Sequence, residues 1–237
     1  MLHKNVCSLL DSFKNAYCLV ASHDASDTFS PMKATATFAV TAGLMALMLS
    51  TGARAESPLA LTVRLYNAAG VSDAEMVAAR GAAGSILRDI WPDVAFRYCG
   101  PRVSSEHPID PCDDALKPSE VVVRVINAPA FKTTLHPDAY GVTYVVKETN
   151  RGWLATVFPD RIDQAASRVG MDRGTLLGLV IAHEVGHLLL GTSYHGATGL
   201  MVAEWPDALL AARKGDAWRF SAFEAAAMRH VLASIAG

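Results

Sequence analysis

The chain has 237 residues and a formal net charge of −2, and 51% of its residues are hydrophobic. This length suffices for one substantial domain or two small ones. The near-neutral charge, without basic runs interleaved with aromatic residues, excludes a typical nucleic-acid-binding protein and describes a soluble globular one.

The beginning of the chain is typical of an exported protein. Residues 38–50 form an uncharged apolar run that follows Lys33 and precedes Ala53-Arg54-Ala55, a small-residue cleavage pattern. This run is too short to span a bilayer, so no stable membrane anchor is expected. We therefore predict three segments: an upstream extension or disordered region (1–31), a signal peptide for secretion or the periplasm (32–55), and a single domain (56–237).

The first part of this domain shows one strand, one helix and a second strand. Apolar and polar residues alternate from Leu61 to Asn67, which predicts a half-buried strand. Ser72 and Glu75 form a capping box at the start of a helix that Trp91-Pro92 ends. We expect this helix to bury Met76, Ala79, Ala83, Leu87 and Ile90. A strand follows at 94–99.

Cys99 and Cys112 are an even pair in the predicted mature chain. In an oxidising compartment they are expected to form a disulfide that closes the proline-rich loop 100–118.

The rest of the chain completes an α+β pattern. We predict strands at 121–126, 139–147 and 153–158, a polar segment after Pro159, an apolar helix at 175–190 and a C-terminal helix at 221–235. The C-terminal helix is expected to bury Phe223, Ala227, Val231 and Ser234 or Ile235. The order β-α-β-β-β-β-α predicts a twisted, mixed five-stranded sheet packed on the N-terminal helix and on helix 175–190.

Helix 175–190 carries His183, Glu184 and His187 in an H-E-x-x-H pattern. Residues four apart share a helix face, so the two imidazoles can bind one metal ion, with Glu184 beside the open coordination position. Burying Glu184 in this apolar run would cost several kcal/mol without compensation, which favours a metal site over two histidines hydrogen-bonded in a core. The pattern is that of a zinc hydrolase.

A third ligand is expected after the helix. Gly191 is suited to a left-handed turn that ends the helix, and His195 and then Met201 follow. The stretch resembles the metzincin signature, H-E-x-x-H-x-x-G-x-x-H followed by a Met-turn, and the order of elements resembles a matrixin-type catalytic domain. The spacing here is H-E-x-x-H-x-x-x-G-x-x-x-H. The resemblance implies that His183, His187 and His195 bind Zn²⁺, that Glu184 is the general base and that Met201 is the Met-turn residue.

Two alternatives at the metal remain open. A later carboxylate could be the third ligand, as in thermolysin-like peptidases, with Glu204 and Glu224 as candidates, although Glu224 is expected on a solvated face. Alternatively, the residues around Cys99 weakly resemble a cysteine switch, in which a thiolate caps zinc.

The resemblance implies a secreted zinc metallopeptidase (a hydrolase) that cleaves a peptide or protein substrate with water activated by zinc and Glu184 as base. The substrate would lie extended along the edge strand 139–147. Because the predicted cleavage site leaves no room for a propeptide, narrow specificity, low substrate affinity or an unidentified inhibitor would restrain activity. The alternatives are a secreted zinc-binding module with this fold that lacks turnover, and a zinc hydrolase of non-peptide amides.

Overall fold

The computed structural model describes residues 60–100, 112–128, 139–146, 148–212 and 215–236. These residues belong to a compact unit that begins at Arg54. The predicted upstream extension, signal peptide and cleavage site lie outside the described residues. None of the helices formed by the described residues combines the length and the apolar character needed to cross a bilayer.

The described residues form five strands and several helices, in an order close to the predicted one. They are β1 (Leu61–Asn67), α1 (Asp73–Arg88), β2 (Val94–Cys99), β3 (Glu120–Val125), β4 (Gly141–Val146), β5 (Arg151–Val157), α2 (Pro159–Val169), α3 (Arg173–Leu190), α4 (Asp207–Ala212), a short 3₁₀ helix (Gly215–Trp218) and α5 (Ala222–Ala236). The sheet order is β2-β1-β3-β5-β4. β4 pairs antiparallel with β5 and the other pairs are parallel, which confirms the predicted mixed sheet.

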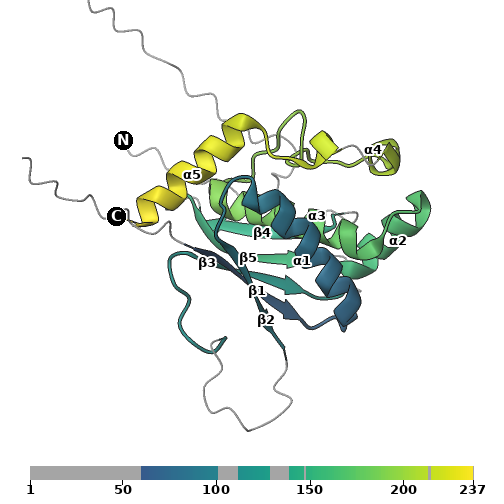
Figure 1. The fold of residues 1–237 in the computed structure, drawn as a ribbon, viewed down its shortest axis with the longest axis horizontal. Helices are drawn as coiled ribbons and strands as arrows, with labels where there is room; N and C mark the ends of the chain where they lie inside the picture. Colours follow the sequence, from purple (N-terminus) through teal and green to yellow (C-terminus); the bar gives the residue numbers. More distant parts are fainter. Residues whose placement is uncertain (1–59, 101–111, 129–138, 147, 213–214, 237) are drawn as a thin grey trace, which may run out of the picture. The chain divides into compact units, whose positions relative to one another are not determined.

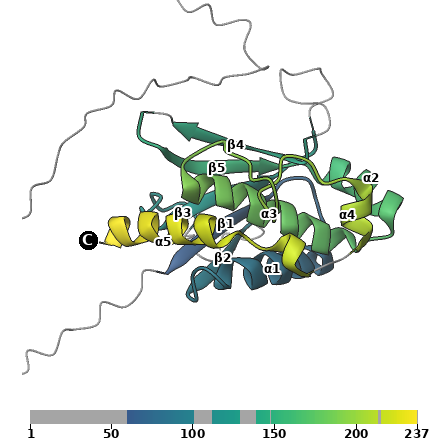
Figure 2. The ribbon, with the colours of Figure 1, turned by 90° about the horizontal axis from the view of Figure 1, so that it is seen from above.

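Helices α1 and α3 cover one face of the sheet (Figures 1 and 2). On β1, Leu61, Val63 and Leu65 are buried in the core against them, so Arg64 and Tyr66 point to the opposite face. The predicted capping box of α1 forms between Ser72 and Glu75, and the predicted apolar positions of this helix are all buried. Besides the sheet and α1, α3 also contacts α2 and α5.

Small residues let α1 and α3 approach each other closely. A Cβ atom added at Gly178 of α3 would lie 2.4 Å from the backbone oxygen of Ala79, and one added at Gly174 would lie 2.7 Å from the Cβ atom of Ala78. At these positions only alanine methyl groups and backbone atoms of α1 face the glycines of α3. The backbone of α1 thus sets the position of α3.

We expect Gly178→Ala to destabilise the fold by at least roughly 1–3 kcal/mol, because its Cβ atom would meet backbone rather than a movable side chain. The matched control is Gly81→Ala on α1, where an added Cβ atom meets nothing within 4 Å. That control should stabilise the protein slightly through helix propensity. Urea unfolding of both variants measures the effect; equal midpoints would contradict the close packing.

Helix α2 was not predicted from the sequence, where residues after Pro159 read only as a polar segment. Pro159 occupies the first turn and Gly170 ends the helix in a left-handed conformation, with φ of 62°. Its buried stripe is formed by Ile162, Ala165 and Ala166. These apolar residues recur at helical spacing, but the segment is polar overall, so it was read as a polar segment rather than as a helix.

The predicted inner face of the C-terminal helix is wrong by about one residue. Phe223 is 77% exposed, whereas Ala225, Met228 and Leu232 are buried. Glu224, expected on a solvated face, is only 2% exposed. It forms a capping box at the start of α5: the Ser221 N–H donates to its carboxylate (2.7 Å), and its own N–H donates to the Ser221 hydroxyl (3.2 Å). This cap determines which face of α5 turns inward.

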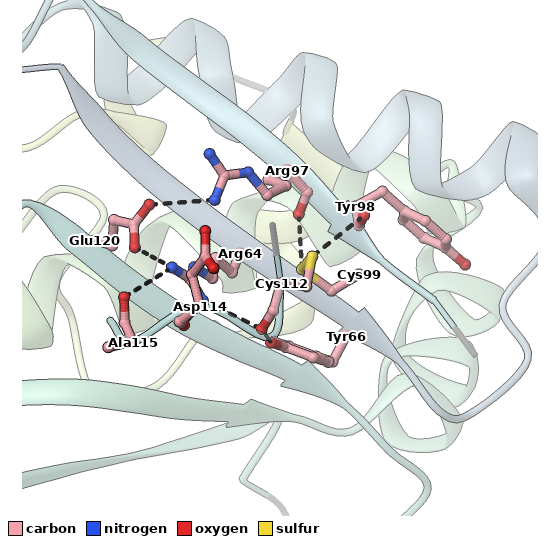
Figure 3. Close-up of a disulfide and its surroundings, with 9 residues drawn as sticks. All are labelled: Arg64, Tyr66, Arg97, Tyr98, Cys99, Cys112, Asp114, Ala115 and Glu120. Atoms are coloured by element: carbon pink, nitrogen blue, oxygen red, sulfur yellow. Dashed lines mark hydrogen bonds and ion pairs between the residues drawn. A yellow bond between two sulfur atoms is a disulfide. The ribbon is translucent and has the colours of Figure 1, made fainter. Parts of the chain in front are cut away.

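Cys99 and Cys112 form the predicted disulfide, which leaves no free thiolate at Cys99 for a cysteine switch. Figure 3 shows how β1 holds the segment around it. The Arg64 guanidinium donates to the backbone oxygens of Cys112 (3.3 Å), Asp114 (2.8 Å) and Ala115 (3.3 Å) and pairs with Glu120. Burial acts to raise the pKa of Glu120, but hydrogen bonds from the Lys117 N–H and from Arg64, with the nearby arginine charges, outweigh it and lower that pKa.

Removing the disulfide should cost roughly 3 kcal/mol of unfolding free energy, because the crosslink closes a loop with a sequence separation of 13. Urea unfolding of a Cys99→Ser/Cys112→Ser variant, compared with the oxidised protein, measures this loss. Adding reductant should shift the midpoint of the oxidised protein only. An unchanged midpoint in the double variant would show that the Arg64 contacts hold the segment without the crosslink.

Candidate metal centre

Three histidine side chains converge at the C-terminal half of α3. His183 and His187 lie one turn apart on this helix, and Gly191 ends it in a left-handed conformation, with φ of 63°, so that the chain turns back and brings His195 beside them. The Nε2 atom of His187 lies 3.1 Å from that of His183 and 3.2 Å from that of His195. Within the described ranges, these three residues are the group whose ligating atoms could hold a metal ion.

The other ring nitrogens show which tautomers are present. The Nδ1 atom of His183 lies 2.8 Å from the Leu200 carbonyl oxygen, and that of His187 lies 3.0 Å from the Thr192 carbonyl oxygen. A carbonyl only accepts, so each Nδ1 carries the hydrogen and each Nε2 presents a lone pair. Both helix histidines are therefore oriented by the loop that follows α3.

The cluster fits a tetrahedral zinc ion. Zinc–nitrogen bonds of about 2.0–2.1 Å place two tetrahedral ligand atoms about 3.3–3.4 Å apart. The observed separations of 3.1 and 3.2 Å are close to this value. Lone pairs facing each other at such distances repel unless a cation lies between them, so the arrangement favours a bound metal over a hydrogen-bonded core.

The electrostatic environment keeps the three rings neutral. Burial lowers the pKa of His183 to about 4 and that of His187 to about 3, and it also lowers the pKa of the more exposed His195. Neutral imidazole is the form that binds metals, so protons do not compete with a metal ion near neutral pH.

Glu184 is buried beside the histidines but turns toward the edge strand β4. Its Oε2 atom accepts a hydrogen bond of 2.6 Å from the Thr143 hydroxyl. Burial raises the pKa of Glu184 to about 7, against the opposing effect of this hydrogen bond. A carboxylate with a pKa near neutrality is well matched to general base catalysis.

Met201 and Trp205 complete the surroundings. Met201 is fully buried, and its sulfur atom lies against α3 at Gly186, where an added Cβ atom would come within 2.7 Å of it. The Met201 carbonyl accepts a 2.8 Å hydrogen bond from the Gly196 N–H, next to His195. The Trp205 ring packs edge-on against His183, with 5.6 Å between ring centroids.

The carboxylates considered as alternative third ligands lie apart from the cluster. Glu204 is exposed. Glu224 caps α5, and its Oε1 atom would lie 2.9 Å from a Cβ atom added at Gly196. Neither belongs to the group that could hold the metal within the described residues.

Sequence reasoning missed Thr143 and Gly141 at this site. Thr143 and Gly141 are brought to Glu184 by strand pairing, across about 40 residues of chain. No spacing in the sequence indicates that contact.

No known family model matches this chain, and no curated protein matches it in sequence. Solved structures with a similar fold include a zinc-dependent peptidase from Methanocorpusculum labreanum, with 14% identity, a TM-score of 0.46 and coverage of 70% of this chain and 99% of that one. Archaemetzincin from Methanopyrus kandleri has 13% identity, a TM-score of 0.47 and coverage of 73% and 96%. Metalloproteinase-II from Bacteroides fragilis has 13% identity and a TM-score of 0.47, over 76% of this chain but 55% of that one. At these values the likeness assigns neither a family nor an activity.

Proposed function

We propose that this chain is a zinc-dependent endopeptidase that hydrolyses peptide bonds with Glu184 as general base. One observation carries the proposal: the Nε2 atom of His187 lies at near-tetrahedral separations from those of His183 and His195, beside a buried carboxylate, and backbone carbonyls orient both helix histidines. His183, His187 and His195 would hold the ion. A bound zinc would supply Lewis-acid polarisation of a peptide carbonyl and activation of water.

The chain's own residues provide the proton transfer. Glu184 lies one position from a ligand, and its burial raises the pKa of its carboxyl group to about 7. It can therefore accept a proton from the attacking water and deliver it to the leaving amine. A pKa of about 7 suits Glu184 to both roles near neutral pH.

An extended peptide is the substrate that the sheet supports best. β4 forms an edge of the described sheet, next to β5, so its outer backbone groups can pair with another chain. The same strand contacts Glu184 through Thr143. A peptide paired with β4 would thus pass close to the proposed base.

We further propose that the protein acts after export, in the periplasm or outside the cell. Support comes from the predicted signal peptide, and from the Cys99–Cys112 disulfide, which is typical of an oxidising compartment. N-terminal sequencing of the exported protein should find Glu56 first.

The test combines metal content with peptide cleavage. The purified protein should contain one zinc per chain and cleave a mixed peptide library, and a chelator should abolish cleavage. Zinc without any cleavage would indicate a binding module that lacks turnover. Turnover of small amides without peptide cleavage would indicate a hydrolase of non-peptide amides.

A further inference from the structure

The carboxylate of Glu184 is held by the edge strand rather than by its own helix. The Thr143 Oγ1 atom on β4 lies 2.6 Å from Oε2 of Glu184 and 3.2 Å from the Glu184 backbone oxygen. The hydroxyl has a single hydrogen, and the shorter distance directs it to the carboxylate. Among the described residues, Thr143 is the one that donates a hydrogen bond to this carboxylate.

Gly141, two residues earlier on β4, faces the other oxygen and leaves room for it. A Cβ atom added there would lie 2.7 Å from Oε1 and 2.9 Å from Cδ of Glu184. Gly141 and Thr143 share the face of β4 that turns toward α3, since side chains alternate along a strand. On β4, the Thr143 hydroxyl thus binds Oε2, and Gly141 leaves space for Oε1 because it has no side chain.

We propose that Thr143 is a positioning residue for the general base, and that Gly141 leaves the space this position requires. The proposal rests on the proposed function. A glutamate side chain rotates about several bonds, and the hydrogen bond to Oε2 selects one carboxylate orientation, leaving Oε1 free to accept a proton. Because the peptide would pair with the same strand, β4 aligns the base and the substrate within one rigid element.

Thr143→Val removes the hydroxyl and keeps the side-chain shape. It should lower kcat by roughly 10- to 100-fold, as expected for loss of a hydrogen bond to a charged group, with KM and zinc content little changed. Thr143→Ser should recover most of this loss. Gly141→Ala keeps the hydroxyl but displaces the carboxylate, and should also lower kcat with zinc retained. Thr149→Val, in the exposed β4–β5 turn, is the matched control and should leave kcat unchanged.

A second measurement does not depend on activity. Urea unfolding of the metal-free wild type, Thr143→Val, Glu184→Ala and the double variant at pH 8 gives the coupling between the two side chains, because alanine cannot accept the hydrogen bond. Non-additive effects of the two substitutions would support the contact even if no peptide were cleaved, in which case only the proposed function would fail. Additive effects, an unchanged kcat in Thr143→Val, or a Thr143→Ser variant no better than Thr143→Val would each overturn the positioning role.

Discussion

Replacing Glu184 with Gln should lower kcat by roughly 10²- to 10⁴-fold while one zinc per chain remains bound, because the substitution removes the proton acceptor and no ligand. Gln has nearly the same shape as Glu and can keep a hydrogen bond with Thr143. Peptide-cleavage kinetics together with metal analysis separate the two effects. Unchanged cleavage would refute the assignment of Glu184 as base.

The same substitution should make the metal-free protein more stable at alkaline pH. Burial raises the pKa of Glu184 from 4.5 to about 7, so the folded state resists its ionisation. Below pH 4.5 the carboxyl group is protonated in both the folded and unfolded states and the penalty is absent. It grows between pH 4.5 and 7 and is then constant, at roughly 3 kcal/mol for such a shift.

Thermal unfolding of both proteins in a chelator, from pH 4 to 9, measures this difference. Ionisation of the buried histidines destabilises both proteins alike at low pH, so the comparison isolates Glu184. Parallel curves at all pH values would mean that burial does not disfavour the Glu184 carboxylate.

Replacing His195 with Ala should abolish stoichiometric zinc binding and, with it, peptide cleavage. The loss of a direct ligand should weaken metal affinity beyond the roughly 10- to 100-fold typical of an outer-shell partner. His195 lies on an exposed loop, so the fold itself should persist. Competitive titration with a chromogenic chelator gives the affinity, and circular dichroism checks the fold.

The matched control is His230→Ala, which removes an exposed histidine on α5, outside the cluster. This variant should bind zinc like the wild type. Retention of zinc and activity by His195→Ala would mean that the third ligand lies elsewhere.

Local signals predicted the elements whose apolar pattern is strong. The capping box at Ser72 and the apolar spacing from Met76 to Ile90 predicted α1 correctly. Both signals are local, because a helix cap and the helical spacing of apolar residues each involve only a few neighbouring residues. His183, Glu184 and His187 were recognisable for the same reason: one helix sets their geometry. The end of α3 at Gly191 could also be predicted from the sequence, because a left-handed helix end favours glycine.

What could not be predicted depends on contacts between distant segments. Phe223 is an apolar residue that the Ser221–Glu224 cap rotates outward, so apolar character alone gave the wrong face of α5. Thr143 reaches Glu184 only because β4 folds back on β5 and packs against α3. His195 was expected beside the two helix histidines from the resemblance, but the unusual spacing left a later carboxylate as an alternative, because the position of His195 depends on the path of the loop.

The open edge of β4 also has consequences for how copies of this protein meet one another. A strand whose outer edge has no partner among the described residues, and which exposes Tyr144 and Val146, is a template for self-association through backbone pairing. The pairing register of β4 with β5 shifts between Tyr144 and Val145, and such an irregularity twists an edge strand. The regular stretch is thereby confined to Gly141–Tyr144, the end nearest Glu184. A short regular stretch can pair with a single flexible chain but offers few positions to a second rigid sheet, which is how bulges generally limit edge-to-edge pairing.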